Sequence, residues 1–436
     1  MYGLCRFLVI LTAIFGMAAN AKAATHESVL HAFLGGTDGS GPRSNLVGDP
    51  KSALYGTTGN AIYQLTPPTA GSTGWTRTTI YTLRPKQDGA VLGNLLLAHG
   101  GTLYGTASAG GTSATCCGTV FALKPNAKHT AWTFSVLYQF KGGKDGGGGS
   151  TNPITPNFSQ LVMDRFGALY GSTLLGGAGR VCCGTVFKLD RPATGQTTWT
   201  KTTLHVFKGT PDGIEPVGPL YVAPNGKVFG TTLYGGSNSL CDPTPVSGGC
   251  GTIFELTPPA SGQTDWTETL ITPAESMVYP YSGLISDGKG GLYGTAQVTT
   301  TRGDSEEWGS VFRVTAATPA HPDGTYQDIY YFAANADGRY PEAGLTIDNT
   351  GALFGTTLFG GTNFSCPEAV GCGTVFKLVP TDTTGTSWKE SILQRFSGLN
   401  GEKPMASLLL GSDGALYGTT IAGGARKDGI IFQLTQ

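Results

Sequence analysis

The chain has 436 residues, of which 39% are hydrophobic and 13% are charged, and its formal net charge is -1. This composition supports a packed core and excludes extensive disorder. The near-zero charge excludes a general attraction to nucleic acid or to anionic lipid, and 68 glycines without a collagen period indicate many turns.

Residues 1–23 have the features of a signal peptide. Arg6 supplies a positive charge, residues 7–15 form an apolar run, and Ala21-Lys22-Ala23 matches a cleavage site. A membrane anchor is the alternative, but the apolar run is shorter than the ~20 residues that a span needs. We therefore expect a secreted or periplasmic chain that starts at Ala24 and has no membrane span.

One phrase recurs along the rest of the chain: Leu-Tyr-Gly or a variant, a Gly-Gly loop, and a Thr-Val-Phe-like run. The glycine of Leu-Tyr-Gly marks seven units, at Gly56, Gly105, Gly171, Gly230, Gly294, Gly355 and Gly418. Each unit holds four candidate strands rich in Thr, Val, Tyr and Phe, joined by short turns, which predicts an antiparallel meander. In the third unit the strands are predicted at 160–163, 168–173, 185–189 and 199–207.

Seven such meanders bury their faces by closing into a ring, so we predict an all-β fold, a seven-bladed β-propeller. The last unit lacks a fourth strand, and the orphan strand 28–33 matches the fourth strand at 135–140. We expect this N-terminal strand to complete the last blade. An open β-solenoid or two smaller propellers are the alternatives. A single domain, 24–436, then has blades at about 43–84, 91–140, 158–208, 217–272, 282–333, 343–396, and 405–436 plus 27–33.

Most tryptophans occupy one position, at the start of the fourth strand. They are Trp75, Trp132, Trp199, Trp266 and Trp388, and Tyr326 takes this place in the fifth unit. These rings are either stacking platforms for a ligand or packing between blades. We favour packing, because a periodic aromatic residue usually belongs to a core.

The phrase itself resembles the tandem repeat of the bacterial Gloeo/Verruco (GloVer) proteins. Residues 351–361 together with 373–378, and residues 414–424, carry the resemblance most closely. It covers nearly all of the mature chain and implies an exported, propeller-like repeat protein. The family brings no established reaction.

The loops between the second and third strands share one end of a meander with the connections between blades, and long loops are where binding usually occurs. Eight mature cysteines lie in these loops: Cys116, Cys117, Cys182, Cys183, Cys241, Cys250, Cys366 and Cys372. In an exported chain they predict one local disulfide per loop, whereas a reducing compartment would leave free thiols. For the adjacent pairs, a strained vicinal bridge would offer a flat platform for a ligand or a redox function, and a cross-link between neighbouring loops is the alternative.

Aromatic residues are also expected at this end of the molecule. The candidates for ligand contacts are Trp308, Tyr234, Tyr279, Tyr340 and Phe364, beside the carboxylates Glu306 and Glu307. Aromatic rings beside carboxylates suit carbohydrate, although each ring alone is more often packing.

Asp-Gly recurs in the connections between blades, at Asp38, Asp88, Asp145, Asp212 and Asp337. Carboxylates at one end of a ring suit Ca²⁺, but Asp-Gly is also a common turn, which we favour. The six histidines do not cluster, and His31 and His205 occupy a tyrosine position of the fourth strand. The chain lacks the common catalytic and nucleotide-binding motifs, and we predict no catalytic residue, no metal site and no cofactor.

The sequence thus predicts an exported repeat protein that acts as a binding or scaffold module, for glycan or for a surface protein, without catalysis. One alternative is a polysaccharide-active enzyme with its site at the loop end. A second is a quinoprotein-like oxidoreductase, because residues 193–199 resemble a blade motif of that class.

Overall fold

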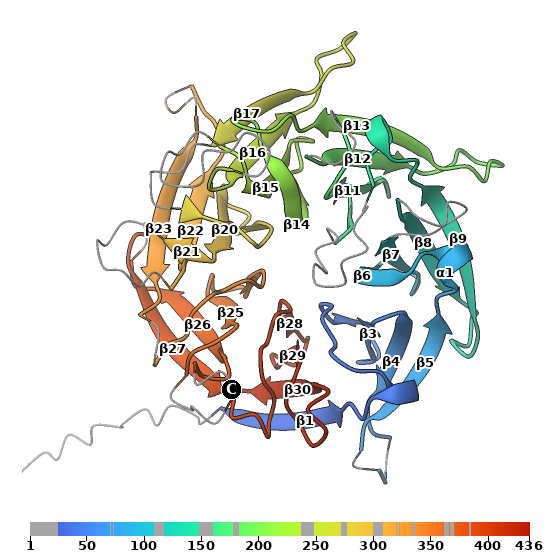
Figure 1. The fold of residues 1–436 in the computed structure, drawn as a ribbon, viewed down its shortest axis with the longest axis vertical. Coiled ribbons are helices and arrows are strands. Elements are labelled where there is room, and N and C mark those ends of the chain that lie inside the picture. The colour runs from blue at the N-terminus through green and yellow to red at the C-terminus, as the bar shows by residue number, and fades with distance from the viewer. Residues whose placement is uncertain are drawn as a thin grey trace, which may run out of the picture.

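The computed structural model describes residues 25–69, 71–72, 74–108, 117–147, 160–177, 183–236, 248–271, 277–299, 308–319, 321, 323–333, 336–361, 366, 370–382 and 385–436. The strands form seven four-stranded antiparallel sheets, the blades, arranged in a ring (Figure 1). The chain is therefore the seven-bladed β-propeller that the repeats predict. We number the blades 1 to 7 in the chain order of their innermost strands.

Each blade is a meander that runs from the axis outwards. The innermost strands are β2 (Val47–Gly48), β6 (Val91–Leu97), β10 (Val162–Met163), β14 (Ile214–Val222), β19 (Ile285–Ser286), β24 (Thr346–Ile347) and β28 (Leu409–Leu410). The second strands are β3 (Leu54–Thr58), β7 (Leu103–Ser108), β11 (Leu169–Thr173), β15 (Val228–Tyr234), β20 (Gly291–Ala296), β25 (Leu353–Thr357) and β29 (Leu416–Thr420). The third strands are β4 (Ala61–Thr66), β8 (Thr119–Pro125), β12 (Thr185–Asp190), β16 (Thr252–Thr257), β22 (Ser310–Thr315), β26 (Thr374–Pro380) and β30 (Ile430–Thr435). The outermost strands are β5 (Thr76–Thr82), β9 (Trp132–Gln139), β13 (Thr200–Val206), β17 (Thr267–Ile271), β23 (Thr325–Tyr331), β27 (Trp388–Arg395) and β1 (His26–Ala32).

The other regular elements in the described part of the chain are short. Strands β18 (Met277–Val278) and β21 (Val298–Thr299) form a two-stranded pair, and helix α1 spans Pro85–Asp88. Two 3-10 turns lie at Gly36–Asp38 and Gly143–Asp145. In blade 3 the observed strands differ from the predicted ones by one or two residues at their ends, as strand ends commonly do.

The glycine of Leu-Tyr-Gly is required by close packing inside each blade. In blade 4, Gly230 pairs with Phe254 across β15 and β16. A Cβ atom on Gly230 would lie 2.5 Å from Cζ of Phe254 and 2.8 Å from Cδ2 of Leu220. The other six glycines of this set face a Phe or Tyr ring in the same way. Because the third-strand ring lies over the glycine, no larger residue fits there.

The ring closes through its two ends. Strand β1 runs antiparallel to β30, with Val29 opposite Phe432, and the two strands lie side by side in Figure 1. Blade 7 thus takes its outermost strand from the N-terminal part of the chain, as the orphan strand predicts. The pairing covers the edge of β30 that would otherwise be open.

The repeated tryptophans pack between neighbouring blades. Trp132 of blade 2 contacts Tyr55 of blade 1 edge-on, with ring centroids 5.8 Å apart. The same contact joins Trp75 to Tyr417, Trp199 to Tyr104, and Trp388 to Tyr293. Each of these tyrosines belongs to the Leu-Tyr-Gly phrase of the preceding blade. The packing interpretation of the tryptophans is confirmed.

Candidate functional site

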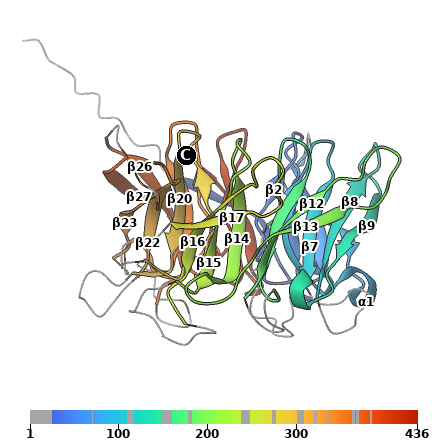
Figure 2. The same cartoon turned by 90° about the horizontal axis from the view of Figure 1, so that it is seen from above.

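The two ends of the propeller differ in their connections. The connections after the second and fourth strands of a blade lie together, and we call this end the loop end. Backbone bridges join the two kinds of connection, at Gly147–Leu175, Arg339–Phe359 and Glu402–Ala422. Helix α1, in the connection from blade 1 to blade 2, marks this end at the lower edge of Figure 2. The other end, the turn end, carries the connections after the first and third strands.

Four residues at the loop end hold an unusual backbone conformation. Glu215, Tyr279, Tyr340 and Lys403 each directly precede a proline and have φ values of 58°, 56°, 56° and 58°. This left-handed region is unfavourable for residues other than glycine and costs about 1 kcal/mol or more at each position. In blade 1 the equivalent residue is Gly41, with φ 54°.

The strained conformation serves the contact between blades. The backbone amide of Tyr340 donates a hydrogen bond of 2.9 Å to the backbone carbonyl of Trp308 in the preceding blade. The backbone amide of Gly41 donates one of 2.7 Å to the backbone carbonyl of Asp428. The backbone therefore needs the conformation but not the side chain, since glycine fills the role in blade 1. We infer that the Tyr279 and Tyr340 side chains have a role of their own.

One aromatic group, the tyrosine cluster, comprises Tyr234, Tyr279 and Tyr281. The rings of Tyr234 and Tyr279 meet edge-on at 5.6 Å. Burial, followed by the carboxylate of Glu342, raises the pKa of Tyr281 to about 12, and Glu215 adds to this effect. Burial also raises the pKa of Tyr234, so the phenols of Tyr234 and Tyr281 stay neutral and keep their hydroxyl groups as hydrogen-bond donors.

A second group, the tryptophan cluster, comprises Trp308, Arg339, Tyr340 and Phe359. The guanidinium carbon of Arg339 lies 4.7 Å from the centroid of the Trp308 ring, 5.9 Å from that of Tyr340 and 5.7 Å from that of Phe359. Backbone hydrogen bonds between Arg339 and Phe359, of 3.0 and 3.2 Å, hold the two loops together. All four side chains are half-buried, so each also keeps part of its surface in solvent.

A small polar pocket lies where the blades meet around the axis. It has a volume of about 70 Å³, and its lining includes Arg43, Asn45, Asn94, Tyr281, Glu342 and Met405. Asn45 links several blades, because its amide nitrogen donates to Asn94 at 2.7 Å and its Nδ2 to Gln160 at 2.9 Å. Its Oδ1 accepts a hydrogen bond from the amide of Ser407 at 2.8 Å.

Two carboxyl groups near this pocket are held partly out of water. Burial raises the pKa of Glu342, although Gln297 Nε2 donates a hydrogen bond of 2.6 Å to its Oε1. Burial also raises the pKa of Glu215. Glu342 lines the pocket, and the carboxyl groups of Glu342 and Glu215 both act on the pKa of Tyr281, which also lines it. Acid–base chemistry on a glycan requires two carboxyl groups at one site.

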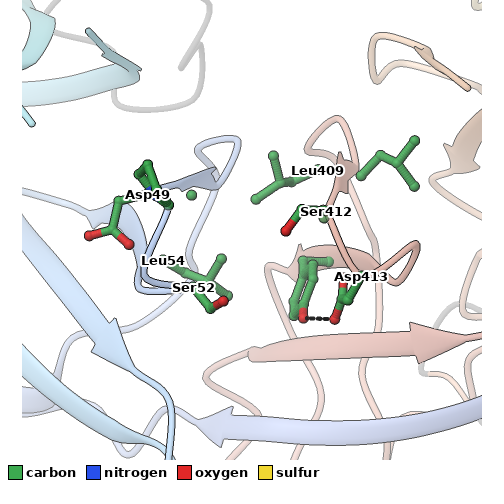
Figure 3. Close-up of a pocket in the computed structure, with 11 residues that line it drawn as sticks. Asp49, Ser52, Leu54, Leu409, Ser412 and Asp413 are labelled. Atoms are coloured by element: carbon green, nitrogen blue, oxygen red, sulfur yellow. Dashed lines mark hydrogen bonds between the residues drawn. The ribbon is translucent and has the colours of Figure 1, made fainter. Parts of the chain in front are cut away.

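A larger pocket, of about 290 Å³, lies at the turn end between blades 1 and 7 (Figure 3). Its acidic residues are Asp49 and Asp413, from two turns that face each other. Asp49 accepts the Tyr55 hydroxyl at 3.0 Å and Asp413 accepts that of Tyr417 at 2.8 Å. Both carboxylates also accept backbone N–H groups of their own turns. Both carboxylates thus stabilise their own turns through these hydrogen bonds. For this reason we do not take this pocket as the functional site.

The cysteine loops are partly described. Cys366 and Cys372 form a disulfide with a Cα–Cα distance of 5.6 Å, which confirms one local bridge. Cys117, Cys183 and Cys250 are disulfide-bonded as well. Cys116, Cys182 and Cys241 lie outside the described residues, as do Phe364, Glu306 and Glu307. The vicinal and cross-linked alternatives therefore both stay open.

The Asp-Gly connections follow the turn interpretation. Each of the five carboxylates accepts a backbone N–H within its own connection, and each contacts a His or Tyr of the preceding outer strand. The side-chain pairs are His31–Asp38, Tyr81–Asp88, Tyr138–Asp145, His205–Asp212 and Tyr330–Asp337. Histidine thus replaces tyrosine as the partner of the aspartate in two blades. Among the described residues, His205, Asp212 and Glu268 form the one group with the spacing of metal ligands.

The sequence prediction placed Tyr234, Tyr279, Trp308 and Tyr340 at the loop end, and the structure gathers them there as two pairs. The sequence prediction did not identify Arg339, Phe359, Tyr281, Glu215 or Glu342. A repeated x-Pro step at Pro42, Pro216, Pro280, Pro341 and Pro404 was the available signal. In four of these blades the residue after the proline lines the axial pocket, as Arg43, Tyr281, Glu342 or Met405.

The fold and the loop end define the class of this protein. It is a seven-bladed β-propeller with an asymmetric aromatic surface at one end. A model of the Gloeobacter/Verrucomicrobia repeat matches residues 59–241 and 243–436. The protein therefore belongs to the Gloeobacter/Verrucomicrobia repeat family. Comparison with curated proteins gave no match. Within the part of the chain that the structure describes, no helix is long and apolar enough to cross a membrane.

Solved structures support the fold. A streptogramin B lyase aligns with a TM-score of 0.52 and 13% identity, over 94% of this chain and 97% of that one. Virginiamycin B lyase from Staphylococcus aureus aligns with a TM-score of 0.50 and 13% identity, over 94% and 99%. The extracellular domain of a hybrid two component system from B. thetaiotaomicron aligns with a TM-score of 0.51 and 13% identity, over 95% of this chain and 43% of that one. At such identities the likeness concerns the fold alone.

Proposed function

We propose that this protein is an exported glycan-binding module that uses the loop end of blades 4 to 6. The observation that carries the proposal is the pair Tyr279 and Tyr340, which keep aromatic side chains at strained positions where Gly41 suffices. Export is the expectation drawn from residues 1–23.

The chemistry of this surface suits a sugar. Aromatic faces such as that of Trp308 pack against the C–H groups of a pyranose ring, and the phenols of the tyrosine cluster donate hydrogen bonds to its hydroxyls. Arg339 and Lys403 are cations beside the rings of the tryptophan cluster, with Lys403 Nζ 5.4 Å from the Phe359 centroid. The surface therefore favours a glycan with acidic groups over a neutral one.

A second candidate, a polysaccharide-active enzyme, is favoured by one observation. Glu342 has a pKa raised by burial, as a general acid for glycoside cleavage requires, and both Glu342 and Glu215 act on the pKa of Tyr281 in the lining of the pocket. The small volume of the axial pocket argues against it, because a sugar ring does not fit into about 70 Å³.

The test is a glycan array with the mature chain, followed by a product assay on every glycan bound. Trp308→Ala removes a ring of the tryptophan cluster and leaves the carbonyl that Tyr340 contacts, so we expect at least tenfold weaker binding. Phe166→Ala is the matched control, because Phe166 is 75% exposed at the turn end. Product release that stops in Glu342→Gln would establish the enzyme instead. Binding that both alanine variants retain would refute the proposed surface.

A further inference from the structure

A group of three ligating side chains lies between the outer strands of blades 3 and 4. His205 Nε2 is 3.0 Å from Asp212 Oδ1 and 3.5 Å from Glu268 Oε1. The ligand atoms of the three residues all lie within 4.8 Å of one another. The side chains are only 14%, 14% and 16% exposed, in the order His205, Asp212 and Glu268. The group shares no residue with the two aromatic clusters, and the inference drawn from it does not depend on the proposed glycan site.

The repeats show what is unusual about this group. The residue two positions after the blade tryptophan faces the Asp-Gly connection of the preceding blade. In blade 1 this residue is Arg77, whose Nη1 lies 3.5 Å from Asp38. In blade 3 it is Lys201, whose Nζ lies 2.8 Å from Asp145. In blade 4 it is Glu268, so Asp212 faces a second carboxyl group where Asp38 and Asp145 face a cation.

Two carboxyl groups in such a sheltered place cannot both be charged without a further positive charge. Burial, together with the hydrogen bond to Asp212, raises the pKa of Glu268 far above its ordinary value. Burial opposes ionisation of Asp212 too, but hydrogen bonds from His205, Glu268 and the Lys208 amide outweigh it and lower the pKa of Asp212. Within the described part of the chain, Oε1 of Glu268 is buried and accepts no hydrogen bond.

We propose that His205, Asp212 and Glu268 form a binding site for a divalent transition-metal ion of the Zn²⁺ class. The ion takes the place that the Lys201 ammonium occupies in blade 3. It thereby ties the outer strand of blade 3 to that of blade 4.

The donor set selects the metal. One imidazole nitrogen with two carboxylates matches the mixed N/O ligands of Zn²⁺, with water in the remaining position. Ca²⁺ and Mg²⁺ prefer sites made of oxygen alone. The ring of Phe207 meets that of His205 edge-on at 4.7 Å and restricts its orientation.

Blade 6 provides an internal contrast. Glu390 occupies the position of Glu268, and Asp337 that of Asp212. The partner from the preceding outer strand is Tyr330, whose hydroxyl donates to Asp337 at 2.9 Å. A neutral phenol is a poor ligand for zinc, so this second pair of carboxyl groups is not expected to bind the ion.

The experiment uses the full mature chain, freed of metal with a chelator and titrated with ZnCl₂ by calorimetry at pH 7.5. We expect one equivalent of Zn²⁺ to bind with a Kd in the micromolar range or tighter. The measured enthalpy should depend on the ionisation enthalpy of the buffer, because side chains that ligate a metal ion release protons on binding. Addition of Zn²⁺ should also raise the Tm.

The matched variants are taken from the other repeats. Glu268→Lys introduces the residue of position 201, and His205→Tyr introduces the residue of positions 81, 138 and 330, so both are expected to fold. Each should weaken Zn²⁺ binding at least 100-fold and abolish the rise in Tm. His31→Tyr, at the equivalent histidine beside Arg77, should leave binding unchanged.

Three results would overturn the proposal. One is a wild-type chain that binds no Zn²⁺ at 100 μM. Another is binding that persists in both Glu268→Lys and His205→Tyr. The third is tighter binding of Ca²⁺ than of Zn²⁺ at the same residues. If one variant fails to fold, the other variant and the anomalous scattering of zinc in wild-type crystals decide the question.

Discussion

The side-chain amide of Asn400 donates a hydrogen bond of 2.6 Å to the carboxylate of Glu27, a residue 373 positions earlier in the chain. Gln394 donates a second hydrogen bond to the same oxygen. Glu27 lies in β1, and both donors belong to blade 6 or to the connection that follows it. The N-terminal strand is therefore fixed on both sides, by β30 within blade 7 and by these side chains of the neighbouring blade.

This contact predicts a pH dependence. Burial is the main reason that the pKa of Glu27 is raised, so the protonated carboxyl favours the folded chain. The contribution of Glu27 to stability is complete below its ordinary pKa and is lost as pH rises through the raised value. Glu27→Gln, which keeps an acceptor and cannot ionise, should match the wild type at pH 4 and exceed it at pH 8. Because Glu27 is partly exposed, we expect a gain of less than about 1 kcal/mol.

Urea unfolding of both proteins at several pH values measures the difference directly. A gain that is constant with pH, or a Glu27→Gln variant less stable at pH 8, would contradict this description of the closure.

The signature glycine predicts a strong steric effect. Gly230→Ala places a methyl group 2.5 Å from the Phe254 ring, and the packed blade leaves little room for the ring to move. We expect a loss of roughly 1–3 kcal/mol or more in the free energy of unfolding. Gly74→Ala is the control, since a Cβ there meets nothing within 4 Å. Equal stability of the two variants in chemical denaturation would refute the packing argument.

Lys201 predicts what happens when a connecting aspartate loses its cation. Lys201 is 4% exposed in its side chain and donates to the Asp145 carboxylate and to the Asp145 carbonyl. Lys201→Met should cost roughly 3 kcal/mol, because Asp145 is left without the cation that balances its charge. The exposed pair Lys188–Asp190 supplies the control, and Lys188→Met should change stability by less than about 1 kcal/mol. A negligible effect of Lys201→Met would undermine the charge comparison on which the zinc site rests.

The disulfide between Cys366 and Cys372 predicts a modest stabilisation. The bridge closes a short loop, so the entropy lost by the unfolded chain corresponds to roughly 2 kcal/mol. The Cys366→Ala, Cys372→Ala double variant should unfold at a correspondingly lower urea concentration, and a reducing agent should lower the wild-type midpoint. An unchanged midpoint in the double variant would show that packing alone holds the loop.

The fold was predictable because the repeated sequence pattern of each blade and the strand that closes the ring indicate the same architecture. The pair that Gly230 and Phe254 form recurs in every blade, with Tyr63 in place of the phenylalanine in blade 1, and each copy makes the same cross-strand contact. The match between residues 28–33 and 135–140 identified the strand that completes blade 7. Such signals lie in short stretches of sequence and need no knowledge of long-range contacts.

The site was predictable only in part. Tyr340 and Trp308 lie in loops that the order of the strands assigns to the loop end. Their location could therefore be predicted from the sequence. Arg339 and Phe359 meet only because a backbone bridge joins two connections, which no local pattern reports. The contact between His205 and Glu268 was not predicted for the same reason. The two residues lie in different blades, and each fits the pattern of its own repeat.

The variant Tyr340→Gly tests the central claim most directly, because glycine relieves the strained backbone and removes only the side chain. Stability and glycan binding are measured on the same preparation, by urea unfolding and calorimetry. We predict a free energy of unfolding equal to or above that of the wild type, with binding at least tenfold weaker. A variant that binds the glycan as tightly as the wild type would contradict the assignment of the loop end as the binding surface.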